Sequence, residues 1–174
     1  MPVPLIWIGA GLAAIYAGDK VRQANKVNRQ FVQHYPGEVK SIVSPKDGAI
    51  VCCGIYGVFE HTGIWVDGNI IELKGNGLIR GISPQRFLTG RSGNQIFVLC
   101  DTYADPLIAP KAVESSVARL FEYTRYDLIR NNCHRFVSQC VAQTNQPVTS
   151  FSDLNRVLHA YFKTALCWYP TNIS

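Results

Sequence analysis

The chain begins with an apolar stretch that is followed at once by basic residues. Residues 2–17 (PVPLIWIGAGLAAIYA) carry no charged side chain, and Lys20, Arg22, Lys26 and Arg29 come directly after them. About 20 apolar residues span a bilayer, and roughly 17 is the lower limit. A polybasic flank is attracted to anionic headgroups and marks the cytoplasmic side. We therefore expect residues 2–17 to anchor the chain in a membrane; the alternative is a buried helix of the folded domain.

The rest of the chain changes from strand-like alternation to helical spacing. Strands are predicted at residues 38–43, 49–53, 58–66, 70–73 and 96–99, with turns at residues 45–48 and 67–68. Helices are predicted at residues 20–32, 110–123, 133–143 and 152–166. The pattern predicts an α+β fold in which an antiparallel sheet packs against helices. Residues 1–32 would form an apolar anchor and a basic helix, and residues 33–174 one folded domain.

Composition narrows the classes of partner. Charged residues make up 17% of the chain and apolar residues 47%, whereas soluble domains carry roughly 25% charged residues. Part of the molecule is therefore expected to face something other than water. The formal charge is +5, but the basic residues are dispersed apart from the cluster after residue 17, so nucleic-acid binding is not predicted. No cofactor, no metal and no oligomeric state is predicted.

The six cysteines are expected to be reduced thiols. They are Cys52, Cys53, Cys100, Cys133, Cys140 and Cys167. Cys52 and Cys53 are adjacent in a strand-like run and point to opposite faces, and no CxxC pair occurs. The apolar content can also build a core without disulfides. A disulfide framework is therefore not predicted.

A hairpin at residues 59–74 brings together two titratable side chains. With Asp67 and Gly68 as the central residues of a tight turn, Gly63 lies opposite Glu72. His61 and Glu72 then become diagonal neighbours on one face, within side-chain reach. A carboxylate in this position fixes the tautomer of an imidazole base. The alternative is an exposed hairpin face with ordinary polar residues.

The second informative segment surrounds Cys133. Asn131 or Asn132 is a natural N-cap, which would place Cys133 in the first turn of a helix. There the helix dipole lowers the pKa of a thiol, and the free amides can hold an oxyanion. Cys133 also falls on one apolar helical stripe with Phe136 and Cys140. Helical spacing alone therefore leaves a buried core residue equally open.

A resemblance to a known family favours the chemical interpretation. HTGIWVDGNIIEL at residues 61–73 and NNCHRFV at residues 131–137 resemble the lecithin:retinol acyltransferase family, which includes HRAS-like phospholipases and acyltransferases. PKDGAI at residues 45–50 resembles that family's opening strand turn, and the resemblance covers residues 38–145. It implies a circularly permuted papain-like (NlpC-like) fold, with the histidine strand before the cysteine helix.

Transferred to this sequence, the resemblance implies that Cys133 is the nucleophile and His61 the base. The third catalytic position, often a second histidine in the family, is Glu72 here. After the nucleophile the family commonly has Glu-His-Phe, whereas this chain has His134, Arg135 and Phe136. That departure concerns the substrate class more than the nucleophilic chemistry. Because His134 is next to Cys133 on a helix, we expect it to point away from the thiol.

The resulting hypothesis is a membrane-associated thiol acyl hydrolase or acyltransferase. It would act on lipid acyl esters through an acyl-enzyme on Cys133, with its catalytic domain on the cytoplasmic side. One alternative is a cysteine peptidase or amidase of the same superfamily, which would use the same residues on a peptide or isopeptide bond. Another is a non-catalytic interaction module that has kept the fold.

Overall fold

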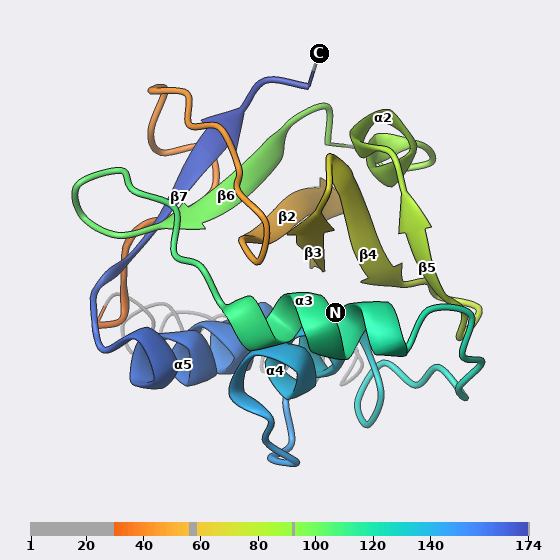
Figure 1. Cartoon of the computed structure of the whole chain (residues 1–174). Helices are drawn as coiled ribbons and strands as arrows, with labels where there is room; N and C mark the ends of the chain where they lie inside the picture. Colours follow the sequence, from red (N-terminus) through yellow and green to blue (C-terminus); the bar gives the residue numbers. More distant parts are fainter. Residues whose placement is uncertain (1–29, 56–58, 92, 174) are drawn as a thin grey trace, which may run out of the picture.

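The computed structural model describes residues 30–55, 59–91 and 93–173, which form an α+β domain around a seven-stranded sheet. The predicted membrane segment, residues 2–17, lies outside the described residues. The strands are β1 (Val32–His34), β2 (Ile50–Ile55), β3 (Phe59–Val66), β4 (Asn69–Leu73), β5 (Ile79–Ile82), β6 (Ile96–Cys100) and β7 (Leu166–Thr171). Their order across the sheet is β1-β7-β6-β2-β3-β4-β5, and Figure 1 labels the strands from β7 to β5.

Helices cover the two faces of this sheet unequally. The described ranges contain α2 (Pro84–Leu88), α3 (Pro110–Ala118), α4 (Cys133–Ala142) and α5 (Phe151–Phe162). α3, α4 and α5 lie together on one side of the sheet, and α2 lies on the other side near β4 and β5 (Figure 1). Within the described ranges, no helix has the length and apolar character needed to cross a membrane.

Apolar side chains are buried on both faces of the sheet. The larger cluster joins the sheet to α4 and α5 and contains Ile64, Phe136 and Leu154. The smaller cluster lies on the other face and includes Val51 and Phe87. Since both faces are covered, the hairpin of β3 and β4 has no broad solvent-exposed face.

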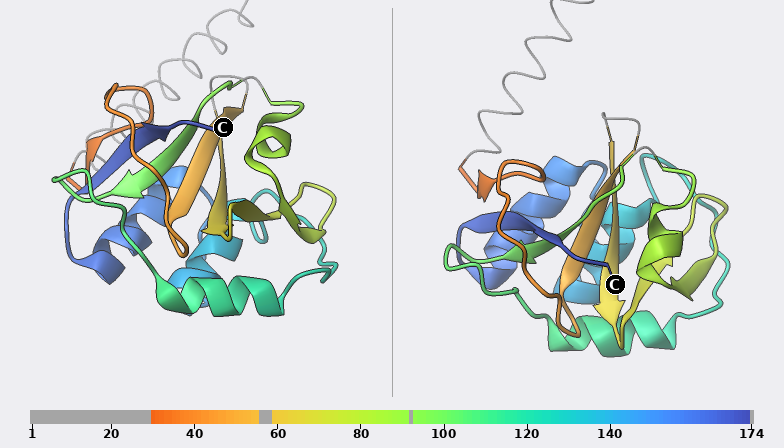
Figure 2. Two further views of the ribbon diagram at one scale, coloured as in Figure 1. Left: turned by 45° about the horizontal axis from the view of Figure 1, so that its top comes forward. Right: turned by 90° about the horizontal axis from the view of Figure 1, so that it is seen from above.

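The edge formed by β1 and β7 differs from the prediction. All neighbouring strands are antiparallel except β1 and β7, which run parallel, so the expectation of a wholly antiparallel sheet is wrong there. β1 begins at Val32, where a helix was predicted to end. Figure 2 shows β7, a strand that the pattern did not predict, between β6 and β1.

Several predicted boundaries also shift. Residues 38–43 form no strand, and Val43 donates its backbone N–H to Pro170 O at 2.9 Å. The helix predicted at 110–123 ends at Ala118. The last helix ends at Phe162 because Lys163 adopts a left-handed conformation with φ 55°, which turns the chain toward β7. β5 and α2 were not predicted.

Candidate active site

Cys133 is the first residue of α4, as predicted, and Asn132 is the N-cap. The Asn132 side-chain oxygen accepts the backbone N–H of Arg135 at 2.9 Å. Its Nδ2 donates to the carbonyl oxygens of Leu128 and Thr149, both at 2.8 Å. Asn132 therefore fixes both the start of the helix and the loops beside it.

Asn131, the other candidate cap, has a different role. Its Nδ2 donates to Thr124 Oγ1 at 2.6 Å and to the carbonyl oxygen of Arg125 at 2.8 Å. The structure thus resolves the choice between the two asparagines, because Asn131 ties together the loop before α4 and does not cap the helix.

The predicted hairpin brings His61 and Glu72 into contact. Asp67 and Gly68 have φ values of 47° and 71°, as a type I′ turn requires, and Val66 lies opposite Asn69. His61 Nε2 is 2.6 Å from Glu72 Oε2. His61 is 4% exposed and Glu72 is 0% exposed. The alternative of an exposed polar face is therefore wrong.

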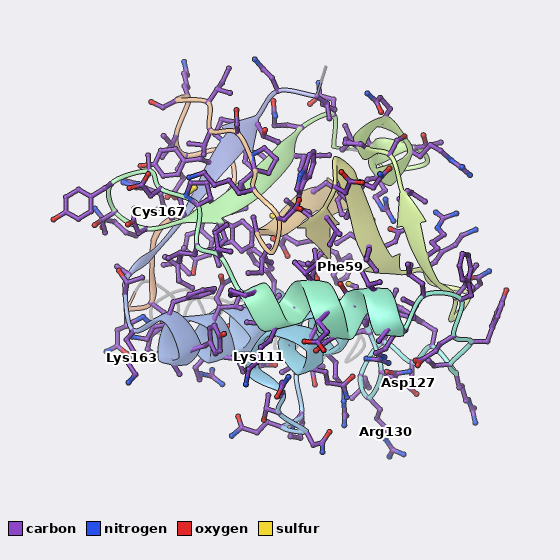
Figure 3. The ribbon with its side chains drawn as sticks, in the orientation of Figure 1. Phe59, Lys111, Asp127, Arg130, Lys163 and Cys167 are labelled. Carbon is purple, nitrogen blue, oxygen red and sulfur yellow. The ribbon has the colours of Figure 1, made fainter. Side chains whose placement is uncertain are left out.

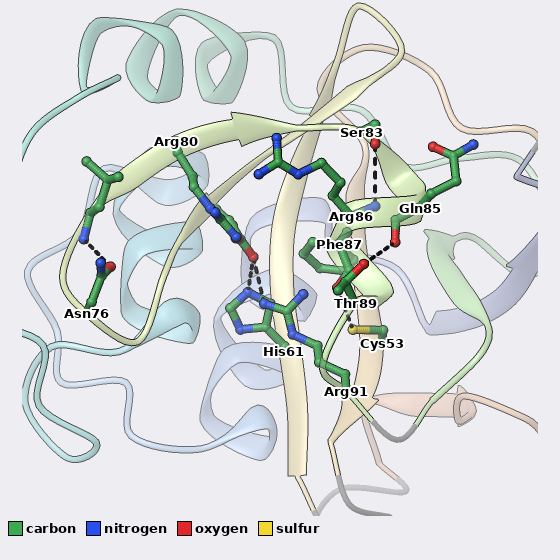
Figure 4. Close-up of polar contacts among 12 residues, drawn as sticks. Cys53, His61, Asn76, Arg80, Ser83, Gln85, Arg86, Phe87, Thr89 and Arg91 are labelled. Atoms are coloured by element: carbon green, nitrogen blue, oxygen red, sulfur yellow. Dashed lines mark hydrogen bonds and ion pairs between the residues drawn. The ribbon is translucent and has the colours of Figure 1, made fainter.

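Two arginines that the sequence analysis missed complete this contact. Arg80 donates to Glu72 Oε1 from Nε at 2.8 Å and from Nη2 at 2.7 Å. Arg91 Nη2 donates to Glu72 Oε2 at 2.8 Å. Figure 4 shows both guanidinium groups converging with the His61 ring. Arg80 faces Glu72 across the β4–β5 ladder, so a correct prediction of β5 would have revealed it.

These partners keep Glu72 ionised. Burial alone would raise the pKa of the Glu72 carboxyl, but the hydrogen bond and charge of His61, together with Arg91 and Arg80, lower that pKa from 4.5 to about 2. A carboxylate bonded to Nε2 leaves Nδ1 of His61 as the nitrogen for proton transfer. Burial would lower the pKa of His61, but the charge of Cys133 and hydrogen bonds with Cys133 and Glu72 raise it.

Gly63 makes room beside this site for the side chain of Ile70. A Cβ at Gly63 would lie 2.5 Å from Ile70 Cγ2 and 3.4 Å from Phe87 Cε2. Phe87 packs against His61 with ring centroids 5.2 Å apart, and the Arg91 guanidinium lies 4.8 Å from the centroid of the Phe87 ring. The missing side chain therefore admits Ile70. Phe87 contacts the imidazole and the arginine together.

Cys133 lies between two histidines. Burial raises the pKa of its thiol, but the charges of His134 and His61 and hydrogen bonds with both side chains outweigh burial, so the pKa falls well below 9.0. The expectation that His134 points away from the thiol is therefore wrong. Its Nδ1 is 3.2 Å from Thr62 Oγ1, so a residue next to His61 in β3 orients this second imidazole.

The other five cysteines have thiol pKa values that are raised and not lowered. All six are free and buried. Burial raises the pKa of Cys53 and of Cys100 to about 12 and that of Cys140 to about 11. The pKa values of Cys52 and Cys167 are also raised by burial. Cys133 is therefore the one cysteine of this chain whose surroundings favour the thiolate.

Tyr126 is a further site residue that the sequence analysis did not identify. Burial, and then the negative charge of Cys133, raise the pKa of the Tyr126 hydroxyl to about 12, and this hydroxyl hydrogen bonds with both the backbone amide and the thiol of Cys133. A hydroxyl against the first amide of a helix lies where an oxyanion would be held. Tyr126 is seven positions before Cys133, and no spacing rule links the two.

Comparison with known proteins adds no family assignment. No model of a known protein family matches the sequence. A search of curated proteins found no match. Within the part of the chain that the structure describes, no group of three or more His, Cys, Asp or Glu side chains could hold a metal ion. The function is therefore inferred from the geometry and electrostatics around Cys133.

Proposed function

We propose that the chain is a thiol acyl hydrolase or acyltransferase with Cys133 as its nucleophile. The supporting observation is that Cys133, alone among six buried cysteines, has its thiol pKa lowered, by His134 and His61. Its position at the start of α4 adds the helix dipole. A buried core cysteine needs none of these features, and neither does a non-catalytic interaction module.

The chemistry follows from the arrangement of donors. The Cys133 thiolate attacks the carbonyl carbon of an acyl ester, a C–S bond forms, and the carbonyl oxygen becomes an oxyanion. The Cys133 amide and the Tyr126 hydroxyl stabilise that oxyanion. His61 gives its proton to the leaving alcohol as the C–O bond breaks. Water or an acceptor hydroxyl then attacks the thioester, His61 takes its proton, and the thiolate leaves.

Each supporting residue has a distinct function in this scheme. Glu72 holds the tautomer of His61 and stabilises the imidazolium. Arg80 and Arg91 hold Glu72 ionised. His134, whose ring bonds to Thr62, also lowers the pKa of the Cys133 thiol. The site is therefore arranged around one anionic sulfur.

The fold, substrate and location are part of the same proposal. A strand carrying the histidine precedes a helix that begins with the cysteine, in the order that a permuted papain-like (NlpC-like) fold has. The motifs that resemble the lecithin:retinol acyltransferase family and the apolar residues 2–17 favour a lipid acyl ester. We place the protein at a membrane with this domain on the cytoplasmic side.

Mass spectrometry of the intact protein tests the reaction. The full chain is incubated with a soluble acyl thioester and with phospholipid vesicles, and an acyl adduct on Cys133 is expected. Cys133→Ala should abolish the adduct, whereas Cys140→Ala, which removes a buried thiol with a raised pKa, should leave it. An adduct that survives in Cys133→Ala would overturn the proposal. Cleavage of peptides without any acyl transfer from esters would favour the peptidase or amidase.

A further inference from the structure

The loop before α4 exposes large apolar side chains. In residues 123–131, which we term the docking loop, Leu128 is 74% exposed, Ile129 is 67% exposed and Tyr123 is 69% exposed. Phe121, just before the loop, is 80% exposed. Single exposed apolar residues are common, but a contiguous group marks an interaction site.

The backbone of the docking loop is held firmly although the side chains of Leu128 and Ile129 are exposed. Asp127 Oδ1 accepts the backbone N–H groups of Ile129 at 2.9 Å and of Arg130 at 2.8 Å. Asp127 and Asn131 exchange two backbone hydrogen bonds of 3.0 and 2.9 Å. Thr149 Oγ1 donates to the carbonyl oxygen of Ile129 at 3.2 Å. The loop therefore presents Leu128 and Ile129 on a fixed frame, which lowers the entropy lost on binding.

The loop connects this surface with the candidate active site. Asn132 Nδ2 donates to the carbonyl oxygen of Leu128 at 2.8 Å, and Asn132 is also the cap of the helix that begins with Cys133. Tyr126, from the same loop, is half-buried and packs against the core. One face of the loop thus supports the site while the other faces outward.

Two arginines flank Leu128 and Ile129. Arg125 and Arg130 are exposed on either side of Leu128 and Ile129, and Figure 3 shows Arg130 pointing away from the domain on its helical side. Asp127, the acidic residue between these arginines, directs Oδ1 to backbone amides. An apolar tip with basic flanks is complementary to an anionic bilayer, whose headgroups attract arginine and whose interior accepts leucine and isoleucine.

We propose that the docking loop inserts Leu128 and Ile129 into an anionic membrane surface while Arg125 and Arg130 contact lipid phosphates. This inference rests on the proposed function, because it places a membrane that contains the acyl substrate against the loop that supports Cys133. The contact is separate from residues 2–17, so it orients the domain in addition to any anchor in that segment.

Tryptophan fluorescence at the loop tests the insertion independently of that anchor. Ile129→Trp is made in the full chain carrying Cys133→Ser, so that acyl chemistry plays no part. The matched control is Tyr103→Trp, at a side chain that is 86% exposed on another loop. Vesicles contain brominated phosphatidylcholine, with or without phosphatidylserine. Emission of the parent protein is subtracted because Trp7, Trp65 and Trp168 are present in every variant.

The expected result is a blue shift and bromine quenching for Ile129→Trp on vesicles with phosphatidylserine. Adding Arg125→Gln and Arg130→Gln should lose most of that quenching, and Tyr103→Trp should show none. If the tryptophan of Ile129→Trp stays as exposed to water as that of Tyr103→Trp on these vesicles, the proposed membrane insertion is overturned. The exposed apolar side chains would then indicate a protein partner.

A second measurement separates this inference from the proposed function. Leu128→Ser with Ile129→Ser should leave acylation of Cys133 by a soluble thioester unchanged and slow acylation from vesicle phospholipid at least tenfold. If the wild type and this double variant are acylated from vesicles at equal rates, the proposed insertion of the docking loop is overturned, but the proposed acyl-enzyme is not. If the wild-type chain is not acylated but Ile129→Trp inserts into vesicles, the proposed enzymatic function is overturned and the proposed membrane contact is retained.

Discussion

Replacing Glu72 by glutamine should destabilise the domain strongly, because two arginines lose the charge that compensates them. Glu72 is completely buried, and the side chains of Arg80 and Arg91 are only 23% and 13% exposed. Removing one partner of a buried ion pair typically costs about 3–5 kcal/mol. Glutamine keeps the shape of the side chain, so the loss reports charge and not volume.

The pKa of Glu72 gives a second magnitude for the same interaction. Its carboxyl titrates at about 2 in the folded protein instead of 4.5, and a tenfold change in proton affinity is worth about 1.4 kcal/mol. The ionised carboxylate therefore contributes about 3 kcal/mol to the free energy of unfolding, in agreement with the first estimate.

The direction of the shift fixes how this contribution depends on pH. Because the folded-state pKa is depressed, the stabilisation is fully present above the unfolded value of 4.5 and is lost as pH falls toward about 2. At about pH 3, roughly 2 kcal/mol of it should be gone. The wild type and Glu72→Gln should therefore differ by about 3 kcal/mol at neutral pH, and by only about 1 kcal/mol at pH 3.

Urea unfolding of the full chain, followed by near-ultraviolet circular dichroism between pH 7 and pH 3, measures this difference. The control is Glu122→Gln, which breaks a more exposed 3.0 Å pair with Arg119. That control should change the free energy of unfolding by less than about 1 kcal/mol at any pH. Equal stability of Glu72→Gln and the wild type at neutral pH would contradict the proposed role of the Glu72 charge. A difference in stability that does not narrow in acid would also contradict it.

Three further changes have defined outcomes. Iodoacetamide should modify Cys133 selectively at a pH below the ordinary thiol value of about 8.5. His61→Ala and His134→Ala should each shift the pH dependence of this modification to higher pH. If neither variant shifts it, the lowered pKa of Cys133 is contradicted. Asn132→Ala should lower the free energy of unfolding by about 1–3 kcal/mol, since it removes the cap and two side-chain hydrogen bonds. Urea titrations measure this loss. Asn132→Asp should not restore the stability, because it keeps the capping oxygen but turns a carboxylate oxygen toward the carbonyls of Leu128 and Thr149. Gly77→Ala should reduce the melting temperature far more than Gly75→Ala. A Cβ at Gly77 (φ 91°) would meet the Thr124 carbonyl, whereas a Cβ at Gly75 would meet nothing within 4 Å. Equal reductions in the two variants would refute this prediction.

The parts of the site that the sequence predicted correctly are those defined by local rules. The turn at Asp67 and Gly68 sets the register of the hairpin, and that register alone brings His61 to Glu72. An asparagine before a helical pattern likewise places Cys133 in the first turn of α4. Both depend on residues close together in the chain, where turn and cap chemistry decide the geometry.

The parts that could not be predicted depend on long-range packing. Arg91 reaches Glu72 from the segment after α2, and no periodicity connects these positions. His134 turns toward Cys133 because Thr62 in β3 bonds its ring, a contact that exists only once α4 packs on the sheet. β7 contains Pro170, and a proline argues against a central strand. In the fold, β1 pairs with β7 only at Leu166 and Cys167, away from that proline.

The position of β7 also governs how the domain forms. β7 lies between β6 and β1, and both partners come from much earlier in the chain. Strand pairing between distant segments is slow, because closing the long loop costs chain entropy before the contacts of the paired strands form. Until β7 docks, β6 and β1 each present an open edge that can pair with another chain. Recovery of native protein after denaturation should therefore depend chiefly on dilution, which slows association between chains while β7 finds its place.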